Sequence, residues 1–269
     1  MMENTVKNVE SQTASTGVLL GLLPSILSIL GSSPVELGLL STSRPILSLL
    51  LALAAPVINP LRLFDYTDPK NMLAELKMGV KMTTHGTVTS LLVVILQVAL
   101  ALAAVANVTL VSYDLYNKAF SVVLACRYRY HIFLWNLVIP AALWVGGLLS
   151  LMSRSRFELA SASQVVPPWT VRLREWMRRW PGNEASLCGE QNRRRFFWDR
   201  ENKRYFWLSQ ALALGTVAHI FYGTAMLSGY QFVAPADALT IVARYVASAW
   251  VSRLILRSEL AGLAGKTDL

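Results

Sequence analysis

One stretch of the chain, Thr87 to Val111 (TVTSLLVVILQVALALAAVANVTLV), contains 25 residues and no charged side chain. At about 1.5 Å per residue, a helix of this length crosses a hydrocarbon core roughly 30 Å thick. Soluble proteins seldom bury so long an uncharged helix. The stretch therefore predicts a membrane-spanning helix, and the rest of the chain has to be placed relative to the membrane.

Composition extends this prediction to the whole chain of 269 residues, of which 54% are hydrophobic and 15% charged. An average soluble domain has about 25% charged residues. We therefore predict an all-α, polytopic membrane helix bundle of about six spans, within a range of four to six. The expected segments are a disordered polar head (1–16), spans 1–4 (17–153), a basic loop (154–204), spans 5–6 (205–257) and a polar tail (258–269).

The first two apolar runs leave two topologies open. Gly17 to Leu30 contains Pro24, and Ile46 to Leu61 contains Pro56 and Pro60. Such short, Pro-interrupted helices form either a full hairpin across the bilayer or a shallow re-entrant pair. We favour the full hairpin, which gives six spans and places both termini on one side of the membrane. The count is four if the pair only lies in the interface.

The basic loop sets the expected orientation. Residues 154–204 carry 12 of the 25 Lys and Arg residues against six acids. Cytoplasmic loops of membrane proteins are enriched in Lys and Arg, so this loop is predicted to be cytoplasmic and the link Ser112–Tyr130 to face the other side. We expect no nucleic-acid partner, because no zinc-finger spacing, RNA-recognition signature or basic-region heptad accompanies the basic residues.

Part of this loop, WTVRLREWMRRW, has a helical pattern. Leu173, Met177 and three tryptophans lie on one helix face, and arginines occupy much of the remainder; the candidate surface residues are Trp169, Arg172, Trp176, Arg178, Arg179 and Trp180. A face of Trp and Leu opposite arginines is typical of an interfacial helix on anionic lipid. The alternative is an ordinary loop that follows the membrane surface. The expected partners are thus the lipid bilayer and soluble proteins that dock on the loop.

Three polar residues fall inside expected spans: Gln97, His219 and Arg244. Polar groups at membrane depth face the bundle interior or water, and mark either a functional site or hydrogen bonds between helices. Two cations at similar depth repel each other. We therefore expect His219 to be neutral and Arg244 to be met by Gln, Asn or backbone carbonyl oxygens.

No signature of catalysis accompanies these residues. No acid lies deep in any expected span, whereas proton relays and intramembrane acid catalysis use buried carboxylates. The chain has no Gly-rich phosphate loop, no HExxH, no G-x-S-x-G and only three histidines. We therefore predict no catalytic residue, cofactor or metal site, and the enzyme hypothesis is the weaker one. Cys126 and Cys188 match no redox or metal spacing and are expected on opposite membrane faces, without a disulfide.

Three stretches carry a resemblance to a known group of proteins: GVLLGLLPSILSILGSSPVELGLLSTSRPILSLLLALAAPVINPLRLFDY, RYFWLSQALALGTVAHIFYGT and DALTIVARYVASAWVSRLILRSEL. With them the chain resembles largely uncharacterised polytopic membrane proteins of filamentous fungi. Some proteins of this kind are encoded beside secondary-metabolite genes. The resemblance implies a multi-pass protein of the endoplasmic reticulum or another endomembrane, with an accessory or scaffold role. The alternatives are a small transporter of an apolar metabolite and a membrane-embedded enzyme with a lipid-like substrate.

Overall fold

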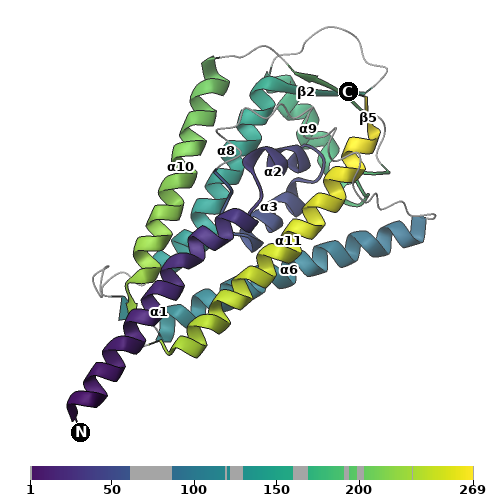
Figure 1. The fold of residues 1–269 in the computed structure, drawn as a ribbon. Helices are drawn as coiled ribbons and strands as arrows, with labels where there is room; N and C mark the ends of the chain where they lie inside the picture. The colour runs from purple at the N-terminus through teal and green to yellow at the C-terminus, as the bar shows by residue number, and fades with distance from the viewer. Residues whose placement is uncertain are drawn as a thin grey trace.

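A computed structural model of the chain is an all-α bundle with a few short strands in the connections between helices (Figure 1). It describes residues 2–60, 87–118, 120–121, 130–159, 169–190, 194–198, 203–231 and 233–268. The long helices are α1 (Met2–Leu30), α6 (Thr87–Lys118), α8 (Ile139–Arg154), α10 (Lys203–Ser228) and α11 (Pro235–Lys266). Within the described ranges, the prediction of an all-α membrane helix bundle is confirmed.

Four stretches are long and apolar enough to cross a membrane: Val88–Asn117, His131–Met152, Tyr205–Ser228 and Pro235–Ala264. They coincide with four of the spans expected from the sequence. The uncharged run in α6 has no Gly or Pro, so nothing in its sequence interrupts an α-helix. A fifth candidate is the pair Ala14–Leu30 and Pro34–Ser41, which is bent by 55°.

Within the described residues, the span expected from Ile46 to Leu61 is too short to cross a membrane. Helix α3 (Pro45–Ala54) has ten residues, which cover only about 15 Å of a bilayer core roughly 30 Å thick. Together with α2 (Pro34–Ser41) it makes a short helical hairpin, the α2–α3 hairpin, packed among α6, α8 and α11. This arrangement differs from both alternatives: α1 and α2 can form one bent span, and α3 is a short helix beside α2. The two described chain ends lie at opposite ends of the bundle rather than on one side (Figure 1).

Local sequence explains where the two helices of the hairpin begin and how closely the chain returns beside them. Ser33 caps α2: its hydroxyl accepts the Glu36 amide N–H at 3.2 Å, and the Glu36 carboxylate accepts the Ser33 amide N–H at 2.7 Å. Pro34 and Pro45 begin α2 and α3, where a missing N–H costs nothing. A Cβ on Gly31 would lie 2.1 Å from the Val57 carbonyl oxygen, so only glycine lets the chain return this closely.

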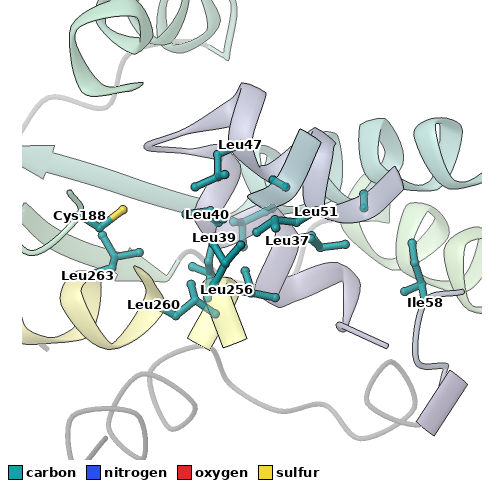
Figure 2. Close-up of a cluster of buried hydrophobic side chains, with 14 of the residues drawn as sticks. Leu37, Leu39, Leu40, Leu47, Leu51, Ile58, Cys188, Leu256, Leu260 and Leu263 are labelled. Carbon is teal, nitrogen blue, oxygen red and sulfur yellow. The ribbon is translucent and has the colours of Figure 1, made fainter. Parts of the chain in front are cut away.

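The α2–α3 hairpin forms the centre of one hydrophobic core. Figure 2 shows its leucines facing residues of α11; the labelled members are Leu37, Leu39, Leu40, Leu47, Leu51, Ile58, Cys188, Leu256, Leu260 and Leu263. A second core joins α1, α6, α10 and α11 around the buried rings of Trp135 and Tyr245. Gly17 and Gly21 bring α1 against Ser228 of α10, where added Cβ atoms would meet Ser228 at 2.9 and 3.1 Å. Small residues of this kind let the backbones of membrane helices approach each other closely.

The remaining elements lie in the links between the long helices. A short helix, α7 (His131–Phe133), continues through the π-helix η1 (Leu134–Val138) into α8. Pro140 lacks the amide that would bond the Asn136 carbonyl, and the wide π turn lies where the α-helical ladder is broken. Strands β1 (Phe120–Ser121) and β4 (Tyr230–Gln231) pair at one end of the bundle.

At the other end are α9 (Trp169–Glu184) and three strands, which occupy the basic loop and the chain end. Strand β2 (Ser155–Leu159) pairs antiparallel with β3 (Arg194–Trp198), and β5 (Thr267–Asp268) adds in parallel. Two segments assigned from the sequence as polar ends are helical. Helix α1 begins at Met2, within the head expected to be disordered, and α11 runs to Lys266 with Leu260 and Leu263 buried.

Candidate functional site: a buried polar junction under the basic helix

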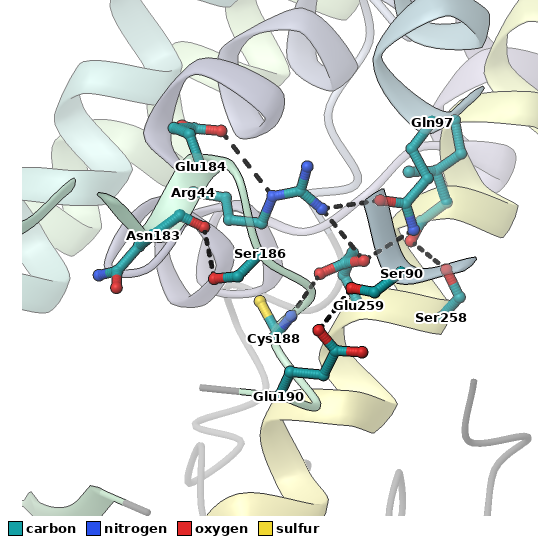
Figure 3. A network of polar contacts seen from close by, with 11 residues as sticks. Arg44, Ser90, Gln97, Asn183, Glu184, Ser186, Cys188, Glu190, Ser258 and Glu259 are labelled. Carbon is teal, nitrogen blue, oxygen red and sulfur yellow. Dashed lines mark hydrogen bonds and ion pairs between the residues drawn. The ribbon is translucent and has the colours of Figure 1, made fainter. Parts of the chain in front are cut away.

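Arg44 lies at the tip of the α2–α3 hairpin, just before α3 begins, and its side chain is fully buried. Its Nη1 donates to Gln97 Oε1 of α6 at 2.7 Å and lies 3.1 Å from Glu259 Oε1 of α11. Its Nε lies 3.8 Å from Glu184 Oε2 of α9. Gln97 Nε2 donates to Glu259 Oε1 at 2.7 Å, which closes the group (Figure 3). We call Arg44, Gln97, Glu184 and Glu259 the Arg44 junction.

A second ion pair joins the same hairpin to α11. Arg253 Nη1 lies 2.6 Å from Glu36 Oε2, which also accepts the Ser33 amide. The hairpin thus contributes the acid in one pair (Glu36) and the base in the other (Arg44). Helix α11 contributes the opposite charges, Arg253 and Glu259. Charges buried at these positions are costly unless each is paired, and here each pairs across elements.

Helix α9 is held against this junction by contacts along its length. The Trp176 indole N–H donates to the Ser41 carbonyl at 3.0 Å, and Glu184 Oε1 accepts the Ile46 amide at 2.5 Å. Beyond the helix end, the Cys188 amide donates to Glu259 Oε2 at 3.1 Å. The Ser90 hydroxyl donates to the Glu190 carboxylate, so α6 holds the same link (Figure 3). The result is a helix fixed to the bundle at both its middle and its end.

Backbone packing completes this attachment. A Cβ on Gly262 of α11 would lie 2.8 Å from the Gly189 amide nitrogen. The link after α9 therefore rests directly on the backbone of α11, a contact that a larger residue at position 262 would open.

The junction holds one guanidinium against two carboxylates. Burial raises the pKa of the Glu184 carboxyl above its usual value of 4.5, against the lowering effects of the Ile46 amide and the Arg44 charge. Burial acts in this direction because the charged form loses solvation by water. Arg44 Nε and Nη2 make no hydrogen bond within the described part of the chain, so Nη1 carries the hydrogen bonding of this guanidinium.

Of the polar residues predicted within spans, only Gln97 belongs to the Arg44 junction. His219 lies on α10, where its Nε2 donates to the Trp135 carbonyl at 2.9 Å and the Trp135 indole N–H donates back to the His219 carbonyl at 3.3 Å. Because a carbonyl only accepts, the Nε2 of His219 carries a proton. These two hydrogen bonds hold η1 against α10, as hydrogen bonds between helices commonly do in membrane bundles.

Arg244 forms a third polar group, between α11 and α6. Its Nε donates to Asn107 Oδ1 at 2.8 Å, so the expected Asn partner is confirmed. Its Nη1 also lies 3.4 Å from Asp114 Oδ2, an acid partner that the sequence did not lead us to expect. The structure thus places Gln97, His219 and Arg244 in three separate groups rather than in one site.

The assignment of Glu259 to a segment outside the spans was wrong. Glu259 falls inside the apolar stretch Pro235–Ala264 and is 3% exposed, as is Glu36 on α2. The error followed from ending the last span at Leu256, which assigned Glu259 to a polar tail. The spacing of Leu256, Leu260 and Leu263 around it continues the buried helix face, and this signal identifies Glu259 as inward-facing.

The surface candidates of α9 divide into two groups. Trp176 donates its indole N–H to the Ser41 carbonyl of the hairpin, and both Trp176 and Trp180 are partly buried. Arg178 and Arg179 are exposed. Trp169 and Arg172 belong to α9, but their side chains are outside the described set. A helix forms here as predicted, but its tryptophan face is directed at the bundle rather than at lipid, and Met177, expected on the same face, is 51% exposed.

Within the described residues, no three His, Cys, Asp or Glu side chains converge as a metal site requires. No model of a known protein family matches the chain, and neither a curated protein nor a solved structure shows significant similarity to it. The site therefore has to be interpreted from its own chemistry.

Proposed function

We propose that this protein is a non-enzymatic membrane component, an accessory or scaffold, that presents α9 as a docking element at one membrane face. The observation that carries the proposal is the Arg44 junction, which connects α9 to the hairpin tip and to two spans. A docking element benefits from such attachment, because a helix already fixed in place loses little entropy on binding.

The polar groups of the bundle interior support this proposal. Arg44 pairs with Glu259, Glu36 pairs with Arg253, and Gln97 bonds to both members of the first pair. These contacts join different elements, and the charged groups are paired with one another. Interior polar groups arranged in this way fix helix packing, as they commonly do in membrane bundles.

The outer surface of α9 has a different character. Val171 and Met177 are 39% and 51% exposed, and Arg174 and Arg178 are exposed beside them. Arginine and methionine are enriched in protein interfaces, where a flat guanidinium and a flexible thioether adapt to a partner. The surface available for recognition is therefore on α9 rather than inside the bundle.

The resemblance to fungal membrane proteins extends the proposal to an accessory role in a secondary-metabolite pathway, at the endoplasmic reticulum or another endomembrane. The experiment is gene deletion in the source organism, with metabolite profiling and complementation by the wild type, R174Q/R178Q or the control K203Q/R257Q. Lys203 and Arg257 are exposed on other helices, so the control loses the same charge. We expect the control to restore the profile and R174Q/R178Q to fail at equal protein level. Full restoration by R174Q/R178Q would contradict the proposal.

A second candidate, a small transporter, is favoured by one observation. The α1–α2 pair is a broken helix, and its hairpin carries buried charges inside the bundle, as substrate and ion sites of transporters do. The variant R174Q/R178Q separates the two functions, because it changes the exposed side of α9 and leaves the paired charges in place. A scaffold that docks partners on α9 loses its function in this variant. A transporter that uses the buried charges keeps its function at normal protein level.

A further inference from the structure

The exposed side of α9 has a defined composition and position. Val171, Arg174, Met177 and Arg178 follow one another at helical spacing on the side away from the hairpin, and all four are exposed. We call these residues the arginine face. Glu184, the acid at the end of the helix, is turned inward to Ile46 and Arg44, and the side chain of Glu175, the other acid of α9, is outside the described set.

Contacts of the link after α9 fix its depth relative to the membrane. Glu190 bonds Ser90, which lies two residues inside the span that begins at Val88. Gly189 packs on Gly262, two residues inside the span that ends at Ala264. The link that follows α9 therefore lies level with the ends of two spans. This is the depth of the phospholipid headgroups, which occupy the outer 5–7 Å or so of each leaflet.

The bundle already occupies the opposite side of α9. Trp176 bonds the Ser41 carbonyl, and Leu173 and Trp180 are partly buried. A free amphipathic helix would insert these residues into lipid, but here they pack on protein. The side of α9 away from the hairpin presents two guanidinium groups one helical turn apart, between two apolar side chains, and Arg179 is exposed on the neighbouring side.

We propose that the arginine face binds the phosphate groups of anionic phospholipids in the adjacent leaflet. Arg174 and Arg178 contact the phosphates, and Met177 and Val171 lie against the glycerol and upper acyl region. The inference rests on the proposed function, in which α9 is a docking element, and names its occupant. Anionic lipid is favoured over an acidic protein because the link joined to α9 lies at headgroup depth, and lipid headgroups are present at this level in any membrane that holds the bundle.

The test uses the purified full chain in an uncharged detergent, titrated with phosphatidylglycerol or with phosphatidylcholine of the same acyl chains. Thermal unfolding reports binding, because a ligand of the folded state raises Tm. We expect phosphatidylglycerol to raise Tm more than phosphatidylcholine, and added salt to reduce the difference. In R174Q/R178Q the apparent affinity for phosphatidylglycerol should fall roughly 10- to 30-fold, whereas K203Q/R257Q should keep it.

Several results would overturn the inference. Equal shifts with the two lipids, or equal losses in R174Q/R178Q and K203Q/R257Q, would show that the arginine face has no preference for anionic lipid. An equal shift with inorganic phosphate would identify a soluble-anion site instead. A shift with polyglutamate and none with phosphatidylglycerol would leave the proposed function standing with an acidic protein as partner. No response to either probe would count against both proposals.

Discussion

Arg44 and Glu259 form an ion pair 3.1 Å long in which neither side chain is more than 2% exposed. Glu36 and Arg253 form a second pair between the same two elements with the charges reversed. A hairpin with two pairs of opposite polarity has one favourable register on α11, because sliding or inversion brings like charges together. Buried ion pairs are expensive, and fixing a register is their best-attested use.

Replacing Arg44 with Met should therefore destabilise the protein strongly. The carboxylates of Glu259 and Glu184 would be left without the guanidinium between them, and breaking a buried pair costs about 3–5 kcal/mol. Adding E259Q should recover part of this loss, because the glutamine side chain keeps an oxygen for the Cys188 amide without the buried charge. Thermal unfolding of R44M, E259Q and R44M/E259Q in detergent measures the coupling. Additive effects of the two changes would show that the pair is not energetically linked.

The raised pKa of Glu184 predicts a pH dependence of stability. Burial raises this pKa above 4.5 in the folded state, so between the unfolded and folded values the folded protein binds more protons. The stabilisation that the Glu184 carboxyl contributes is fully present below its pKa in the unfolded chain. It is lost as the pH rises through its pKa in the folded protein. The difference in Tm between wild type and E184Q should therefore shift against the wild type as pH rises from about 4 to 8. A difference constant over this range would refute the assignment.

Two glycines offer a matched pair of substitutions. A Cβ on Gly223 of α10 would lie 2.3 Å from Nε1 of Trp135, whose indole is held by the His219 carbonyl. G223A should therefore cost about 1–3 kcal/mol, the usual range for overpacking. Gly182 of α9 has nothing within 4 Å of an added Cβ, and G182A should be neutral or stabilising by up to about 1 kcal/mol. Equal unfolding temperatures for the two variants would mean that Trp135 does not pack on α10 as described.

The sequence was sufficient to locate the spans but not the junction. Uncharged runs are a local property, so the span containing Gln97 and the amphipathic pattern around Trp176 were both recognisable from spacing alone. The partners of Arg44 come from α6, α9 and α11, and no local pattern specifies which distant charge will meet it. From the sequence alone, a charge between two apolar runs, as at Arg44, is expected in an exposed link at the membrane surface. Only the packing of the hairpin shows that this link is covered by α9.

The fold also revises the expected topology, and labelling can test it. The α1–α2 pair supplies one crossing, α3 is too short to supply another, and four long spans follow, so the two termini should lie on opposite sides. The density of arginines around α9 predicts that Asn183 lies in the cytoplasm. A tag at Asn183 and one after α11 should resist an impermeant external label, whereas a tag ahead of α1 and one at Asn117 should react. Epitope insertion at each position, with and without selective opening of the cytoplasmic side, makes the measurement. If the tags at the two ends of the chain were protected together, α1 and α2 would not cross as one span, and the α2–α3 hairpin would have to enter the bundle from the cytoplasmic face.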